Sequence, residues 1–176
     1  PSLFIPIFKP TINSVSLTGN THQYDTLAVY LIQYTGVPTG NPTLTYQWSW
    51  SNTATGTYTS IPGETAPQFS PPTTYVGKYL RCTVTASGSV SGQAHSASKG
   101  PITSGFASGT GTVDDPYVIT QPGHFLRLNV MPTLGRHFRM AASITLSAQD
   151  MVTRAFAGRL DGNNYQVACN ITSTTD

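Results

Sequence analysis

The sequence predicts an all-β protein in which a β-sandwich is followed by a smaller second β domain. Helical periodicity is scarce along the 176 residues, and short segments of alternating apolar and polar residues are common. Gly, Pro, Asn, Ser and Thr separate these segments, as turn-forming residues do. Seven such segments fall in the first part of the chain, which is the strand spacing of a two-sheet sandwich.

The seven expected strands follow an apolar, proline-rich arm at residues 1–9. They lie at residues 12–18, 26–34, 44–51, 58–61, 68–70, 79–87 and 90–97. In the sixth strand every second side chain is apolar and shares one face: Leu80, Cys82, Val84 and Ala86. This face is expected to lie in the core together with Trp48, because an indole has a large apolar surface to bury.

The second half of the chain has a different residue pattern, with shorter and less regular apolar segments. A Gly-, Ser- and Thr-rich stretch at 103–111 is expected to be a linker between the sandwich at 10–102 and a C-terminal β domain at 112–176. Shorter strands are expected at 117–119, 137–140, 143–146 and 166–170, with room for one or two turns of helix between 121 and 130.

Three separated segments of the first half carry a family resemblance. They read YQW at residues 46–48, YTSIPGET at 58–65 and YVGKYLRCTVTA at 75–86. In this order they resemble the immunoglobulin-like modules of bacterial surface proteins and tailed-phage virion proteins, with Trp48 in the place of the strand-C tryptophan. Two features depart from antibody domains: residues 27–32 contain no cysteine to pair with Cys82, and Tyr79 is one residue too far from Cys82 for a tyrosine corner.

Two segments of the second half resemble right-handed β-helix surface proteins. GTGTVDDPYVI at 109–119 is similar to the segment that leads into such a helix, and FAGRLDGNNYQV at 156–167 is similar to one of its rungs, with Asn164 at a position that often holds Gly. One rung cannot bury a solenoid core. The C-terminal domain is therefore expected either to be part of a longer chain or to pack against another chain.

Composition narrows the function classes. Only 9% of the residues are charged, against roughly 25% in ordinary soluble domains, and such a surface is typical of secreted, surface-layer and virion β-proteins. Six scattered arginines do not form the basic stripe that nucleic acid requires. No segment has the length of a membrane-spanning helix. Cys82 and Cys169 fall in different expected domains and are predicted to be free, buried thiols.

No catalytic, cofactor-binding or metal-binding residue is predicted. Hydrolase, zinc-protease and phosphate-loop motifs are missing, the four histidines lack metal-ligand spacing, and Asp114, Asp115 and Asp161 are interpreted as turn residues. The residues singled out for structure are the core set Trp48, Leu80, Cys82 and Val84. A candidate docking arm is formed by Leu3, Phe4, Ile5, Ile7 and Phe8, which could add to the sheet edge of a neighbour or simply form a tail or first strand.

Together these features favour a non-enzymatic structural virion protein of a tailed phage, of the capsid-decoration or fibre-attachment type. It would act on the virion surface by docking to other virion proteins, as a homo-oligomer or on a larger assembly, with no cofactor, nucleic acid or membrane insertion. One alternative is a fragment of an adhesin on the bacterial cell surface that binds glycan or protein, including host-surface glycan. The other is a truncated β-helix protein of the carbohydrate-active tailspike type, which would need further rungs with carboxylates.

Overall fold

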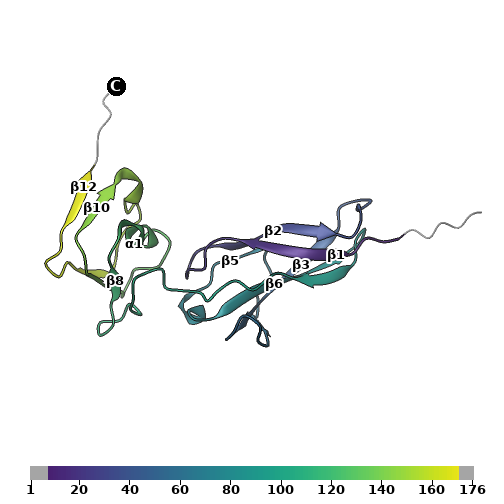
Figure 1. Cartoon of the computed structure of the whole chain (residues 1–176), viewed down its shortest axis with the longest axis horizontal. Coiled ribbons are helices and arrows are strands. Elements are labelled where there is room, and N and C mark those ends of the chain that lie inside the picture. The colour runs from purple at the N-terminus through teal and green to yellow at the C-terminus, as the bar shows by residue number, and fades with distance from the viewer. Residues whose placement is uncertain (1–7, 171–176) are drawn as a thin grey trace, which may run out of the picture. The chain divides into compact units, whose positions relative to one another are not determined.

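A computed structural model describes residues 8–170 and divides the chain into two compact units (Figure 1). Unit 1 is the described part of Pro1–Thr21 together with Asp25–Ile102, and unit 2 is His22–Tyr24 together with the described part of Thr103–Asp176. Strands account for most of the regular structure, and the few helical segments are short. The all-β prediction is confirmed.

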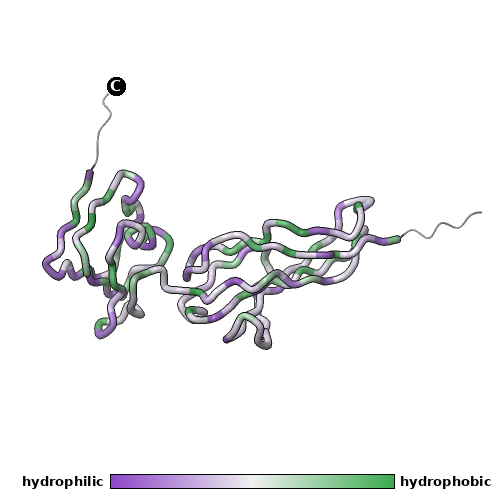
Figure 2. Tube along the Cα trace, viewed as in Figure 1, coloured by the Kyte–Doolittle hydropathy of each residue, from purple (hydrophilic) through white to green (hydrophobic). Residues whose placement is uncertain are grey.

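Unit 1 contains two sheets whose neighbouring strands are antiparallel, with orders β1-β2-β5 and β4-β3-β6-β7. The strands are β1 (Ile12–Thr18), β2 (Leu27–Tyr34), β3 (Thr43–Ser51), β4 (Thr59–Ser60), β5 (Gln68–Phe69), β6 (Tyr79–Ser87) and β7 (Gly92–His95), with the 3-10 turn η1 (Thr73–Tyr75) before β6. Each strand lies within two residues of its predicted bounds. Figure 2 shows how apolar and polar residues are interspersed along them.

Both sheets of unit 1 supply side chains to one core. Leu27 of β2 and Trp48 of β3 are fully buried members of the same cluster. The Trp48 ring lies 5.6 Å from the ring of Phe69 on β5, and its indole N–H donates to the carbonyl of Ala66 at 3.0 Å. The indole therefore packs against the other sheet through Phe69, and its hydrogen bond fixes it to the segment that leads into β5.

Unit 2 is built from parallel strand pairs. Its elements are β8 (Tyr117–Ile119), α1 (Pro122–Arg127), β9 (His137–Met140), β10 (Ile144–Ser147), η2 (Ala148–Asp150), β11 (Arg159–Asp161) and β12 (Val167–Asn170). The first sheet has the order β11-β9-β8, and β10 pairs with β12 in a second sheet, as Figure 1 shows for β10 and β12. The sequence predicted all of these strands except β11, and α1 is a single short helix within the predicted stretch.

The stretch at 103–111 is not the expected linker, because it is packed into unit 2. Phe106 stacks on Tyr117 with ring centres 4.7 Å apart, and the Ala107 N–H donates to the carbonyl of Val118 at 3.1 Å. Gly109 has a φ of +91°, and a Cβ there would lie 2.0 Å from the carbonyl oxygen of Pro116. The small residues of this stretch therefore allow close packing rather than flexibility.

Residues 22–24 also depart from the expected boundary of 10–102, because they belong to unit 2. The Gln23 N–H donates to the carbonyl of Thr103 at 2.8 Å, and the fully buried Gln23 side chain donates to the Tyr117 hydroxyl at 3.1 Å. The buried guanidinium of Arg127 donates to the Gln23 carbonyl. A three-residue segment from the first half of the chain thus contributes buried polar contacts to the second unit.

Candidate functional site

The last part of unit 2 has an open edge. Within residues 8–170, β11 is an outer strand of its sheet and β12 pairs only with β10. We call residues 156–170, which carry β11 and β12, the open rung. Its strands repeat β9 and β10 further along the chain, because Arg159 pairs with His137, an offset of 22 residues, and Val167 pairs with Ile144, an offset of 23.

Equivalent positions of the two rungs differ sharply in burial. Phe138 is 1% exposed, whereas Leu160, its partner on β11, is 41% exposed. Ile144 is 4% exposed, whereas its partner Val167 on β12 is 40% exposed. Since parallel strands in register place paired residues on the same face, Leu160 and Val167 continue the core-facing rows without a layer to cover them.

Two large side chains beside β11 and β12 belong to the same open apolar end. Phe156 is half-exposed, although its ring lies 5.5 Å from that of Phe138. Tyr165 is also half-exposed, in the turn before β12. In that turn Asn163 and Asn164 have φ values of +46° and +62°, which Asn tolerates better than other non-glycine residues.

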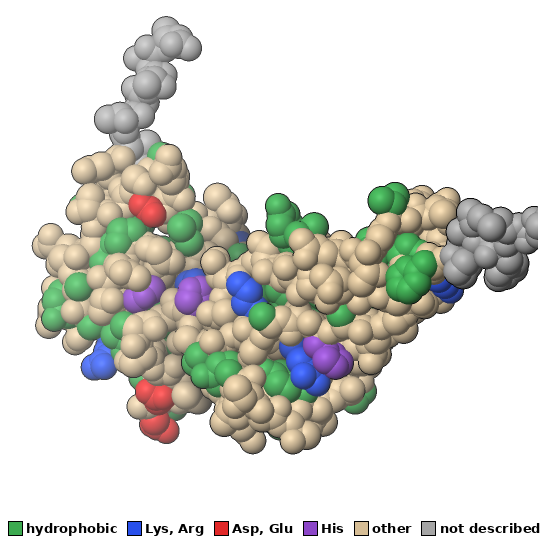
Figure 3. Space-filling view, turned by 45° about the vertical axis from the view of Figure 1, so that its right-hand side comes forward, with side chains coloured by type: hydrophobic (Ala, Val, Ile, Leu, Met, Phe, Trp, Pro, Cys, Tyr) green, Lys and Arg blue, Asp and Glu red, His purple; other side chains and the backbone are tan. Residues whose placement is uncertain are grey.

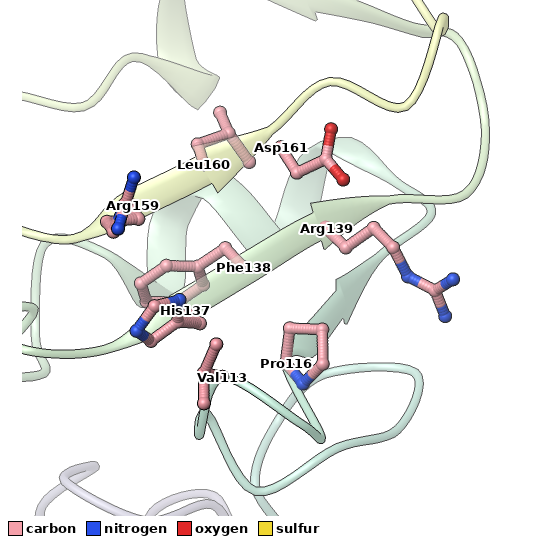
Figure 4. Close-up of a pocket in the computed structure, with 8 residues that line it drawn as sticks. All are labelled: Val113, Pro116, His137, Phe138, Arg139, Arg159, Leu160 and Asp161. Carbon is pink, nitrogen blue, oxygen red and sulfur yellow. The ribbon is translucent and has the colours of Figure 1, made fainter.

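The outward face of the β11-β9-β8 sheet is polar and charged. It borders a groove with a volume of about 270 Å³, and Figure 4 shows its lining. Arg139 of β9 and Arg159 and Asp161 of β11 lie there, with the apolar wall formed by Val113 and Pro116. In the described residues, the guanidinium groups of Arg139 and Arg159 form no hydrogen bond or ion pair, while Asp161 accepts one bond from the Asn163 N–H at 2.9 Å.

The groove and the open rung offer contacts rather than reactive groups. The groove combines cations with one carboxylate, and the open rung adds apolar side chains and an unpaired strand edge. Across residues 8–170, no three His, Cys, Asp or Glu side chains are grouped so that they could hold a metal ion. The arrangement suits recognition of another surface.

The predicted core residues lie elsewhere, inside unit 1. Trp48, Leu80, Cys82 and Val84 are all fully buried in its core. Burial raises the pKa of the Cys82 thiol to about 11, and a backbone hydrogen bond involving Gln47 acts in the opposite direction. These residues hold the fold together and have no access to a ligand.

The prediction for Cys169 is wrong. Both cysteines are free, but Cys169 is exposed and only Cys82 is buried. Cys169 lies on β12, and it pairs with Leu146 of β10, which is buried. The strand at β12 was predicted, but no described residue covers Cys169 there.

Most of the predicted docking arm, namely Leu3, Phe4, Ile5 and Ile7, lies outside the described residues. Phe8 is described, and its side chain is 78% exposed. Together with Val37, which is 88% exposed, it borders a groove of about 290 Å³ on unit 1. The docking role of the arm stays a prediction.

β11 was not among the predicted strands, although its segment was expected to form part of a rung. The RLD triplet at 159–161 places one apolar residue between two charges, which is too short an alternation to predict a strand. The signal that could have indicated it is the spacing of 22 residues between RLD and HFR at 137–139, a repeat of polar–apolar–polar residues.

No family model matches the chain, and no curated protein matches it significantly. None of the helices in the described part of the chain is long and apolar enough to cross a membrane.

Proposed function

We propose that this chain is a non-enzymatic structural protein of a tailed-phage virion surface, of the capsid-decoration or fibre-attachment type, and that it works by docking to other proteins. The observation that carries the proposal is the open rung, where core-facing apolar positions are half exposed and the strand edges are unpaired. Exposed apolar patches and free β edges favour association, and in native proteins they are usually covered.

Unit 1 is proposed to be an immunoglobulin-like sandwich that is displayed by the docked protein. The strand orders β1-β2-β5 and β4-β3-β6-β7 and the shared core support this assignment. So does the position of Trp48, on a central strand that pairs with β6 and packs on Phe69 from the other sheet. In place of an antibody-type disulfide, Cys82 is a buried free thiol.

Unit 2 is proposed to be a partial right-handed β-helix. Its parallel pairs with offsets of 22 and 23 residues are the spacing of stacked rungs, and the Asn163–Asn164 turn occupies the position where the resembling rungs turn. Stacked rungs gain stability from the interfaces between neighbours. A partner that docks on the open rung would cover its half-exposed apolar side chains and supply such an interface.

The low charge of the surface supports a structural role on a particle. Figure 3 shows few Lys, Arg, Asp and Glu side chains among many uncharged ones on the face in view. Removing apolar surface from water contributes about 25 cal/mol for each Å². Binding by a protein with so few charges therefore depends on shape and apolar contact rather than on long-range electrostatic attraction.

The test uses an epitope-tagged chain in the virus or cell that encodes it. The tagged chain is expected to co-sediment with assembled particles, and the double variant Leu160→Lys, Val167→Lys is expected to lose this association. Val37→Lys is the matched control, because Val37 is exposed and apolar but lies on unit 1. Recovery of the chain in a bacterial envelope fraction would favour the adhesin alternative, and turnover of a soluble glycan would favour the tailspike type; either result would contradict the proposal.

A further inference from the structure

The exposed strand of the open rung has a self-complementary charge pattern. β11 reads Arg159, Leu160, Asp161, so a cation and an anion flank the central residue symmetrically, as Figure 4 shows. Both charged side chains lie on the same face of the strand, because they are two residues apart. If two copies of β11 align antiparallel with Leu160 opposite Leu160, Arg159 of each copy faces Asp161 of the other.

The backbone of β11 is oriented for this pairing. The Arg159 N–H donates toward β9, to the carbonyl of Arg136 at 2.9 Å. Since successive residues of a strand direct their N–H and C=O groups to opposite sides, those of Leu160 point to the open edge. Two Leu160 residues placed opposite each other can therefore exchange both hydrogen bonds, as in a hydrogen-bonded antiparallel pair.

Neighbouring registers are electrostatically worse. Shifting the pairing one way places Arg159 opposite Arg159, and shifting it the other way places Asp161 opposite Asp161. Like charges directly across a strand pair are destabilising, whereas opposite charges contribute favourably. The charge pattern thus selects the register that is centred on Leu160.

Copies cannot stack head to tail through this sheet, because the edge at its other end is not free. Beyond β8, the Ala107 N–H donates to the carbonyl of Val118, and the Val118 N–H donates to that of Ser108 at 2.9 Å. The edge of β8 is therefore already occupied by the chain's own residues. A contact that uses the same edge on both copies, related by a two-fold axis, is the arrangement left to β11.

We propose that the partner of the open rung is a second copy of this chain, bound through antiparallel β11–β11 pairing centred on Leu160. The pairing joins two β11-β9-β8 sheets into one sheet across the two-fold axis and brings the half-exposed Leu160 of one copy against Leu160 of the other. This inference rests on the proposed function, since it names the partner of the same docking surface.

Charge reversal provides the test, with the full-length chain followed by sedimentation velocity over a concentration series. The unaltered chain is expected to form a dimer. Arg159→Asp and Asp161→Arg each turn two attractive pairs into two repulsive pairs and are expected to weaken dimerisation by about ten-fold or more. The double variant Arg159→Asp, Asp161→Arg restores the complementarity and is expected to dimerise like the unaltered chain.

Crosslinking gives a second readout of the register. In a Cys169→Ser background, Leu160→Cys is expected to form an intermolecular disulfide on mild oxidation, because opposed residues of a hydrogen-bonded pair have Cα atoms about 5.5 Å apart. Val113→Cys is the control, since Val113 is exposed on unit 2 but does not lie on β11. It is expected to form no intermolecular disulfide under the same conditions.

The outcomes separate this inference from the proposed function. A monomeric unaltered chain, dimers that tolerate both single reversals, or a double variant with intact strand content that fails to dimerise would each overturn β11–β11 pairing. If the unaltered chain is monomeric and its Leu160→Lys, Val167→Lys variant loses particle association, the open rung docks to another protein and not to a second copy. A dimer that never associates with particles would support the pairing and contradict the virion role.

Discussion

Replacing Trp48 with Phe tests whether the indole organises the core of unit 1. The side chain is fully buried, so the smaller ring leaves a cavity, which costs about 1–2 kcal/mol. The substitution also removes the hydrogen bond to the Ala66 carbonyl, 3.0 Å away, at a further cost of about 1 kcal/mol. We expect the free energy of unfolding of unit 1 to fall by about 2–3 kcal/mol.

Urea unfolding followed by tryptophan fluorescence measures this change. Trp48 and Trp50 are the two tryptophans of the chain and both lie in unit 1, so their emission reports this unit selectively. With a urea dependence of about 1–3 kcal/mol per molar, the midpoint should fall by about 0.7–3 M. Trp50 remains as the reporter in the Trp48→Phe variant, and Trp48 remains in the control.

Trp50→Phe is the matched control on the same strand. Trp50 is partly buried, and its ring lies under the Lys78 ammonium, 5.1 Å from the ring centre. An exposed contact of this kind contributes about 0.5–1 kcal/mol, so this variant should lose less than about 1 kcal/mol of stability. Equal shifts for the two variants, or a larger shift for Trp50→Phe, would refute the idea that the buried indole is central to the core.

Three further predictions concern polar and reactive groups. Gln23→Ala should destabilise unit 2 by about 1–3 kcal/mol through its lost bond to Tyr117, seen in far-UV circular dichroism, with a much smaller shift in tryptophan fluorescence. A maleimide should label one thiol of the native chain, Cys169, since Cys82 is buried and has its pKa raised to about 11; mass spectrometry showing two labels would contradict this. Burial lowers the pKa of His124 in the folded state. As the pH falls below the ordinary histidine pKa of about 6.5, the unfolded state therefore binds more protons than the folded state. Unit 2 should then lose stability, by at most about 1.4 kcal/mol per pH unit. His124→Gln should remove that pH dependence, and an unchanged slope would contradict the assignment.

The strands of unit 1 could be predicted because each one separates two different environments. In β6, Leu80, Cys82 and Val84 face the core, and the side chains between them do not. A period of two residues over nine positions is a strong signal. In β11 the same alternation covers only three residues, and the exposure of Leu160 depends on which strands lie beside it. A short pattern carries little information about its neighbours.

Long-range contacts explain the errors at the boundary between the units. Nothing in the local sequence around Gln23 indicates that its side chain is buried against Tyr117, because the two residues are far apart along the chain. The stretch at 103–111 was taken for a linker because Gly and Ser are common in flexible segments. At Gly109 the same residue type is needed because a Cβ would collide with the Pro116 carbonyl. Composition alone does not distinguish a flexible segment from one whose backbone packs closely against another segment.

The charges on β11 could be explained in another way, as protection of an exposed edge against association. Native edge strands often carry charged residues for this reason. Protection against a second copy, however, requires side chains that repel their own images. Arg159 and Asp161 attract theirs in the antiparallel register centred on Leu160, and only two like charges at these positions would keep copies apart. The edge therefore has no electrostatic barrier against itself, and the half-exposed Leu160 beside it gains from being covered.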